Sequence, residues 1–259
     1  MNHNRLLNRT AALLAASLVL ILLWEGASLA FSNNLLPSPL ASFQALVRLL
    51  GQDLGTHFLV SFYRVIASTL LALVLGLPLG LWLGREERAD RWAAPFIYLT
   101  YPIPKIVFLP VILLVLGIGD LSKIFLISVI VFFQIAVTAR DSARSVAPQH
   151  VVSLQSLGAS NWQIYRHVII PACLPDVLTS LRISMGTAVA VLFFAESFAT
   201  TEGLGYFIMD AWSRAASEEM FAGIIAMALL GLIMFLAVDL AEFYLCRWRR
   251  LRGAGSGAQ

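Results

Sequence analysis

Long apolar runs alternate with short polar connections along the chain. Six runs reach about the 20 residues that a helix needs to cross the hydrocarbon core of a membrane. They are Ala11–Phe31, Ser61–Leu83, Pro95–Leu116, Leu121–Ala139, Leu174–Ala199 and Phe221–Leu245. None shows the short segments of alternating polarity that are typical of membrane β-strands. The pattern therefore predicts an all-α integral membrane protein with six transmembrane helices.

The third run is the least regular of the six. It contains four prolines, each of which removes a backbone donor and disfavours a straight helix. They are Pro95, Pro102, Pro104 and Pro110. We therefore expect this span to be kinked or broken and supported by neighbouring helices.

The first run has two interpretations. Arg5 and Arg9 precede it, and Ser28 and Ala30 lie where a cleavage site would be, so one interpretation is a removable secretory signal. The apolar stretch is long for such a signal, which favours a retained first span. On that basis residues 1–55 form a peripheral transmembrane helix with an external connection, and residues 56–259 form the transmembrane core.

Composition supports a membrane protein. Of the 259 residues, 59% are hydrophobic and 13% are charged, whereas a soluble domain has about 25% charged residues. A soluble enzyme, a disordered chain and a fibrous repeat are thereby excluded. The two cysteines and four histidines lack the spacing of a metal site, so we expect no metal. We find no nucleotide-binding or hydrolase motif and expect no catalytic residue.

Lys and Arg residues are distributed unevenly between the two sides of the predicted bundle. Cytoplasmic segments are the ones enriched in these residues. The richer side carries Arg5, Arg9, Arg85, Arg88, Arg91, Arg140, Arg144, Arg166, Arg247, Arg249, Arg250 and Arg252, and the other carries mainly Arg48, Lys123 and Arg214. With six spans, both termini and residues 149–171 are expected in the cytoplasm. This clustering indicates membrane topology and not a nucleic-acid partner.

Residues 149–171 form the longest cytoplasmic connection, and their composition is unusual because it is neither highly charged nor typical of a flexible linker. Two apolar stretches meet at Gly158. Ser160 or Asn161 is a suitable N-cap for a second helix, and Pro171 is expected to end it. Apolar residues recur on one face of that helix, namely Trp162, Tyr165, Val168 and Ile169. We predict two short helices joined at Gly158.

These two helices have apolar faces with no lipid core to enter if they lie clear of the bilayer. One interpretation is a docking element for another cytoplasmic protein. The other is an interfacial helix pair that rests on lipid headgroups. The residues alone leave both open.

Three glycines in the second run share one helix face, because Gly76, Gly80 and Gly84 are spaced four residues apart. Small residues allow two helices to approach closely, and packing drives helix association in lipid. We expect this face to be a helix-packing surface.

Charged residues inside apolar spans are costly and point to function. With two neighbouring prolines, they supply the candidates for a pathway or gate, which are Pro102, Pro104, Lys105, Arg182 and Glu196. Lys105 is either a pathway residue or an interfacial lysine whose ammonium group reaches the headgroups. Glu196 lies about 21 Å along a helix from Arg182, so the two are not expected to pair. We expect Glu196 to shape an outer gate or a docking face.

Several short motifs occur together along the chain. They are LPSP at 36–39, GLPLG at 76–80, YPIPK at 101–105, GIGD at 117–120, AE at 195–196 and GLG at 203–205. In addition, Gly158, Ile169 and Pro171 are spaced as in the cytoplasmic EAA signature, with Val152 where glutamate is usual. With these motifs, most of the chain resembles the permeases of ATP-binding-cassette (ABC) importers, in particular the nitrate/sulfonate/taurine group.

The resemblance implies a type I importer core bundle with cytoplasmic coupling helices, which forms the pathway for a small anionic solute (nitrate, sulfonate or taurine-like). ATPase coupling would involve Val152, Leu157, Gly158, Ala159, Ser160, Trp162, Tyr165, Ile169 and Pro171. The implied partners are a cytoplasmic ATPase dimer that holds ATP and Mg²⁺, a periplasmic or lipid-anchored solute-binding protein, and a second permease copy in the bacterial inner membrane. No cofactor would bind this chain directly.

An autonomous secondary transporter or channel is the alternative. Such a protein needs coupling-ion residues at the midplane and usually has paired inverted repeats. We see neither in the sequence.

Overall fold

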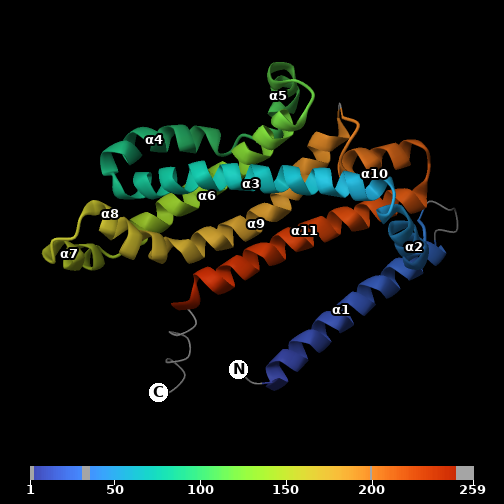
Figure 1. Ribbon diagram of the computed structural model, residues 1–259, viewed down its shortest axis with the longest axis horizontal. Helices are drawn as coiled ribbons and strands as arrows, with labels where there is room; N and C mark the ends of the chain where they lie inside the picture. The colour runs from blue at the N-terminus through green and yellow to red at the C-terminus, as the bar shows by residue number, and fades with distance from the viewer. Residues whose placement is uncertain (1–2, 31–35, 199, 249–259) are drawn as a thin grey trace.

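The computed structural model describes residues 3–30, 36–198 and 200–248, which form helices and the turns between them. The bundle is built on α3 (Asp53–Arg85), α6 (Asp120–Ser145), α9 (Ile170–Ser197) and α11 (Ser217–Leu245), which run along the long axis of the molecule (Figure 1). Each of these helices packs against the next in that order. The all-α prediction is confirmed.

The other helices lie at the ends and the edge of the bundle (Figure 1). They are α1 (His3–Ala30), α2 (Pro39–Leu50), α4 (Glu87–Thr100), η1 (Lys105–Phe108), α5 (Leu109–Leu116), α7 (Pro148–Ser156), α8 (Asn161–Ile164), η2 (Tyr165–Ile169) and α10 (Leu204–Ser213). α7 and α8 form one end, and α10 lies near the other. α1 extends away from the bundle, and its Trp24 ring lies 5.5 Å from the Phe221 ring of α11.

Four helical segments are long and apolar enough to cross a membrane among the described residues. They are Asp53–Arg85, Asp120–Ser145, Asn161–Ser197 and Ser217–Leu245, and a bent pair of helices makes a fifth. The predicted first span falls on α1, whose apolar part Ala15–Ala30 is shorter than these four. The count of six is therefore not reached by length and composition. Phe31 and Ala199, the predicted ends of two spans, lie outside the described residues.

The third span is broken, as its prolines predicted. α4 ends at Thr100, η1 begins at Lys105, and the two halves differ in direction by 79°. Pro102 and Pro104 lie in the break, where they remove two backbone donors from the connection. α5 then continues only to Leu116, and Gly117 with φ of 81° ends it.

The expectation that Pro171 ends the second short helix was wrong. Asn161–Ser197 is one helical run, and Pro171 lies in the first turn of its α9 part. The preceding five residues, Tyr165–Ile169, form a π-helical turn in which the Ile170 N–H bonds the Tyr165 carbonyl. A π turn changes the backbone register, and such turns accommodate residues that an α-helix tolerates poorly. The fifth span therefore begins 13 residues before the predicted Leu174.

α3 and α6 approach each other closely along the face that carries the three spaced glycines. A Cβ at Gly80 would lie 2.7 Å from the Ala139 Cβ, and one at Gly84 would lie 2.8 Å from the Ala143 Cβ. Larger residues at these positions would push the two helices apart. The contact fixes α3 against α6 and so aligns the polar residues that both helices carry near their outer ends.

Candidate functional site

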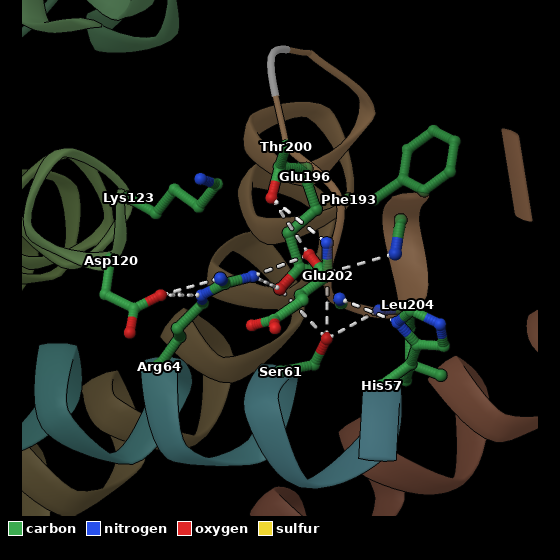
Figure 2. Close-up of polar contacts among 12 residues, drawn as sticks. His57, Ser61, Arg64, Asp120, Lys123, Phe193, Glu196, Thr200, Glu202 and Leu204 are labelled. Carbon is green, nitrogen blue, oxygen red and sulfur yellow. Dashed lines mark hydrogen bonds and ion pairs between the residues drawn. The ribbon is translucent and has the colours of Figure 1, made fainter. Parts of the chain in front are cut away.

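A cluster of buried charged side chains lies where α3, α6 and α9 meet the turn that precedes α10 (Figure 2). We call it the outer cluster. α3 contributes His57, Ser61 and Arg64, α9 contributes Glu196, α6 contributes Asp120 and Lys123, and the turn contributes residues 202–205. The α3 residues recur at helical spacing and therefore point to one side of that helix.

Glu196 is at the centre of the outer cluster and is fully buried. Arg64 Nη1 donates to its carboxylate at 2.8 Å, Ser61 Oγ at 2.8 Å and the Gly205 N–H at 3.0 Å. A buried carboxylate without such partners would be very costly. The arrangement compensates one buried charge with the opposite charge and two further donors.

Arg64 joins the three helices to the turn. Its guanidinium group donates to Asp120 Oδ1 at 2.8 Å through Nε, and to the Glu202 carbonyl at 3.0 Å through Nη1. Only 2% of Arg64 is exposed. Because the planar guanidinium group has several N–H donors in fixed directions, Arg64 alone forms hydrogen bonds with α6, α9 and the turn.

The turn before α10 fits closely over Glu196. Gly203 has φ of 110°, and a Cβ there would overlap the Glu196 carboxyl group. A Cβ at Gly205 would lie 2.6 Å from the Glu196 Cβ. The backbone N–H groups of Gly203 and Leu204 donate to His57 Nδ1 and Ser61 Oγ at 3.1 and 2.8 Å. The AE and GLG motifs are thus two halves of one contact.

Lys123 is the other buried cation of the cluster, with 1% of its surface exposed. Its ammonium group donates to the Gly119 carbonyl at 3.1 Å. Figure 2 shows its side chain beside Asp120 and Glu196. Of the three basic residues assigned to the arginine-poor side, Lys123 therefore lies in the bundle interior.

Arg64 and Lys123 were not recognised from the sequence as buried cations, whereas Lys105 and Arg182 were proposed as candidates. Arg64 lies inside the predicted span Ser61–Leu83, and that position was a usable signal because arginine in a span is costly. Its pairing with Glu196, 132 residues away, had no local signal.

Arg182 lies elsewhere, between α9 and α11. It forms ion pairs with Asp239 and Glu242, and its guanidinium carbon lies 5.6 Å from the centre of the Phe235 ring. As expected, it does not pair with Glu196.

Lys105 stabilises the break in the third span. Its ammonium group donates to the carbonyls of Thr100 and Tyr101 at 3.0 and 2.8 Å, and lies 4.7 Å from the centre of the Phe133 ring. A cation at the C-terminal end of a helix bonds carbonyls that have no partner within the helix. Pro104 precedes η1 as its N-cap residue.

Two helical segments meet at Gly158, as predicted: α7 ends before this residue, and α8 begins after it as the start of the run that continues into α9. Gly158 itself has φ of 78°. Ser160 caps α8 as one half of a capping box, in which Gln163 Oε1 accepts from the Ser160 N–H at 2.7 Å. The sharp turn at Gly158 needs a left-handed backbone that glycine adopts at little cost. We call residues 148–164 the inner knob.

The inner knob has one buried and one exposed side. Val151 and Ile164 are buried against the bundle, and Ala159 packs against it in part. Just after the knob, Ile169 of η2 is also buried and Tyr165 packs in part. On the other side Leu157, Trp162 and Val152 are 83%, 68% and 55% exposed. Trp162 was predicted to share a face with Ile169, and the structure separates them because the helix winds into a π turn between the two.

Within the described residues, no three side chains suited to metal binding lie together. The outer cluster contains charge pairs and backbone bonds among its own residues, and the inner knob presents apolar side chains to the outside. The outer cluster therefore holds helices of the same chain together, whereas the inner knob is an exposed surface suited to contact with another molecule.

Comparisons with known proteins agree with this architecture. Residues 76–250 match the sequence profile of the family described as "Binding-protein-dependent transport system inner membrane component". The taurine transport system permease protein TauC of Escherichia coli (strain K12) is 31% identical, over 93% of this chain and 91% of TauC. The putative aliphatic sulfonates transport permease protein SsuC of Bacillus subtilis (strain 168) is 31% identical, over 89% of this chain and 85% of SsuC.

Solved structures show the same fold. One inward-facing form of the MetNI methionine ABC transporter aligns with a TM-score of 0.63 at 20% identity, over 78% of this chain and 96% of the other. A bacterial ABC transporter involved in alginate import aligns with a TM-score of 0.59 at 17% identity, over 91% and 95%. The chain belongs to the family of inner-membrane components of binding-protein-dependent transport systems.

Proposed function

We propose that this permease is the membrane subunit of an ATP-driven importer for a small sulfonate-type solute. The family supports the transport role, and relatives named for taurine and for aliphatic sulfonates support the solute class. Nitrate is a second candidate solute, because the sequence motifs resemble those of the nitrate/sulfonate/taurine group. The chain supplies the pathway and performs no covalent chemistry.

ATP hydrolysis belongs to a separate cytoplasmic subunit in this proposal, and that subunit holds ATP and Mg²⁺. The single observation that carries it is the exposed apolar side of the inner knob. Contiguous apolar surface at the polar end of a bundle favours a protein partner, and exposed tryptophan is a frequent anchor in interfaces. The buried side of the same knob transmits movement to α9, because α8 and α9 belong to one helical run.

The proposed orientation places the inner knob and both termini in the cytoplasm. The end of α3, the start of α4 and the end of α6 lie at the same end of the bundle as α7 and α8 (Figure 1). These segments carry Arg85, Arg88, Arg91, Arg140 and Arg144. Because cytoplasmic segments are enriched in arginine, this clustering supports a cytoplasmic location for that end. The outer cluster then faces the periplasmic side, where a solute-binding protein would deliver the solute. Two copies of the permease would enclose the pathway in the inner membrane.

Co-purification tests this proposal. The tagged chain is extracted from its native membrane in mild detergent, and its partners are identified by mass spectrometry. We expect an ABC ATPase and a solute-binding protein. Recovery of the chain alone, under conditions that preserve a known ABC complex in the same sample, would contradict it and favour an autonomous transporter.

A Gly158→Asp variant sharpens the result. A charged side chain at the turn between α7 and α8 should prevent docking while the permease remains inserted. The matched control is Gly117→Asp at the end of α5, since Gly117 also has a positive φ, of 81°, and a Cβ there, like one at Gly158, would have no other atom within 4 Å. Loss of the ATPase with both variants would argue against the inner knob as the specific contact.

A further inference from the structure

A polar pocket of about 330 Å³ lies between the break after α4 and the facing sides of α6 and α9. Its lining residues are Tyr101, Gln134, Thr138, Asp176, Thr179, Ser180 and Ile183. We call it the inner pocket. Exposed polar side chains within membrane spans usually face the bundle interior or a water-filled cavity, because lipid does not solvate them. Asp176 and Thr179 are both exposed and line the inner pocket.

The hydroxyl groups of the inner pocket are already engaged with one another. Thr138 Oγ1 donates to Ser180 Oγ at 3.0 Å, and Ser180 Oγ contacts the backbone carbonyl of Gln134 at 3.4 Å. Ser142 Oγ donates to Asp176 Oδ2 at 2.6 Å, which positions the carboxylate at the pocket wall. These bonds hold the wall in one arrangement.

Two side chains of the inner pocket, Gln134 and Asp176, have oxygen atoms that can accept further hydrogen bonds. The side-chain oxygen Oε1 of Gln134 is buried and has no hydrogen-bond partner within the described residues. This oxygen is enclosed by the protein, so the acceptor that the pocket offers to a ligand is the exposed Asp176 carboxylate. Asp176 is the only charged residue that lines the pocket among the described residues. The pocket therefore lacks a positive donor that a ligand would supply.

A positive charge lies beside the Tyr101 side of the inner pocket. The Lys105 ammonium group is 5.3 Å from the centre of the Tyr101 ring and donates to the Tyr101 carbonyl. A purely anionic solute would meet the Asp176 carboxylate, which repels it. A solute with both charges would place its cationic end at Asp176 and its anionic end toward Lys105.

We propose that the inner pocket is a solute subsite that binds the ammonium end of a small zwitterion, such as an aminosulfonate. This deepens the proposed function and rests on it for the sulfonate end and for transport. It separates the solute classes, because taurine carries an ammonium group whereas nitrate and unsubstituted alkanesulfonates do not.

Thiol labelling tests the charge preference without any transport step. Cys173 and Cys246, both buried, are replaced by alanine, and a reporter is introduced as Thr179→Cys or, separately, Ile183→Cys. The full chain is labelled in its native membranes with methanethiosulfonates that carry either an ammonium or a sulfonate end. Each rate is divided by the rate of the same reagent with a small free thiol.

We expect the ammonium reagent to react about tenfold faster at both reporters, because a carboxylate nearby attracts one reagent and repels the other. Asp176→Asn should remove the preference. Asp141→Asn is the matched control, since Asp141 is an exposed carboxylate on α6 that pairs with Arg140 and does not line the pocket, and it should leave the preference unchanged.

Protection by solutes decides the ligand class. Taurine should slow labelling of Thr179→Cys by a neutral maleimide, whereas 2-hydroxyethanesulfonate at equal concentration should not, and Asp176→Asn should abolish the difference. Equal protection by the two sulfonates, a charge preference that persists in Asp176→Asn, or failure of both reporters to react would overturn the subsite. A missing ATPase in co-purification would instead contradict the proposed function and leave these labelling results interpretable.

Discussion

The two ends of α9 treat polar and apolar groups in opposite ways. At the outer end, Glu196 and Arg64 are charged, buried and fully surrounded by partners from the same chain. At the inner end, Leu157 and Trp162 are apolar and exposed, on helices whose other sides are well packed. The outer cluster is complete in one chain, whereas the inner knob leaves an apolar surface uncovered. The difference indicates that the outer cluster stabilises the helix bundle, whereas the inner knob binds a partner.

The largest expected effect is at the outer cluster. Glu196→Ala should lower the stability of the permease by about 3–5 kcal/mol, because Arg64 would stay buried without the buried one of its two counter-charges. Thermal unfolding of the purified permease in detergent, followed by helical circular dichroism, measures the loss. The double variant Arg64→Met with Glu196→Met should lose less than Glu196→Ala, since the carboxylate that it leaves without Arg64, that of Asp120, is about half exposed to solvent. An unchanged melting temperature in Glu196→Ala would refute the fastening role.

The inner knob should respond in association and not in stability. Trp162→Ala should weaken binding of the ATPase by about 2 kcal/mol or more, roughly 30-fold, because exposed aromatic anchors dominate interfaces. Its melting temperature should stay unchanged, since surface substitutions usually alter stability by less than about 0.5 kcal/mol. Titration of the ATPase onto permease in nanodiscs gives the affinity. Wild-type affinity, or a large loss of stability, would remove the contrast between the two ends.

The helix contact that aligns the outer cluster should be sensitive to a single methyl group. Gly80→Ala should cost about 1–3 kcal/mol, because the new Cβ would meet Ala139 and the Ala136 carbonyl of α6. Gly186→Ala is the matched control on α9, where a Cβ has open space, and it should be neutral or stabilising by up to about 1 kcal/mol. The measurement is the melting temperature of each variant. Equal shifts for Gly80→Ala and Gly186→Ala would show that the close contact between α3 and α6 does not contribute to stability.

The smallest expected effect is at the cap of α8. Ser160→Ala should cost about 1 kcal/mol of local helix stability, because it removes half of the capping box. Affinity for the ATPase should fall about fivefold, as measured in the same titration. Ser156→Ala serves as control, since its hydroxyl only bonds the Val152 carbonyl within α7. If both serine variants bind alike, the exact position of α8 has little influence on docking.

Hydrophobic periodicity predicted most of the helices because each long apolar run must satisfy its backbone internally in a membrane. The proline-rich run Pro95–Leu116 broke where its prolines indicated, and the turn at Gly158 with its Ser160 cap followed from local chemistry. The sequence did not predict that the helix continues through Pro171, because the π turn at Tyr165–Ile169 depends on how α8 packs against the bundle.

The outer cluster was the part that local patterns could not assemble. Glu196 was recognised as important, yet its partners Arg64 and Ser61 lie more than 130 residues away on another helix. Which side of α3 faces α9 depends on the contact between α3 and α6, a tertiary property. The glycines spaced by four predicted a close helix contact but did not say which helix would occupy it.

Site-specific photo-crosslinking at the inner knob tests the central claim most directly. A photoreactive amino acid replaces Trp162 or Leu157 in the full chain, and native membranes are irradiated and analysed by mass spectrometry. The same replacement at Leu114, which is 85% exposed on α5, serves as the comparison. We predict that both knob positions crosslink to an ABC ATPase and that Leu114 does not. Crosslinks from the knob to lipid alone would contradict the account, because they would identify α7 and α8 as interfacial helices without a protein partner.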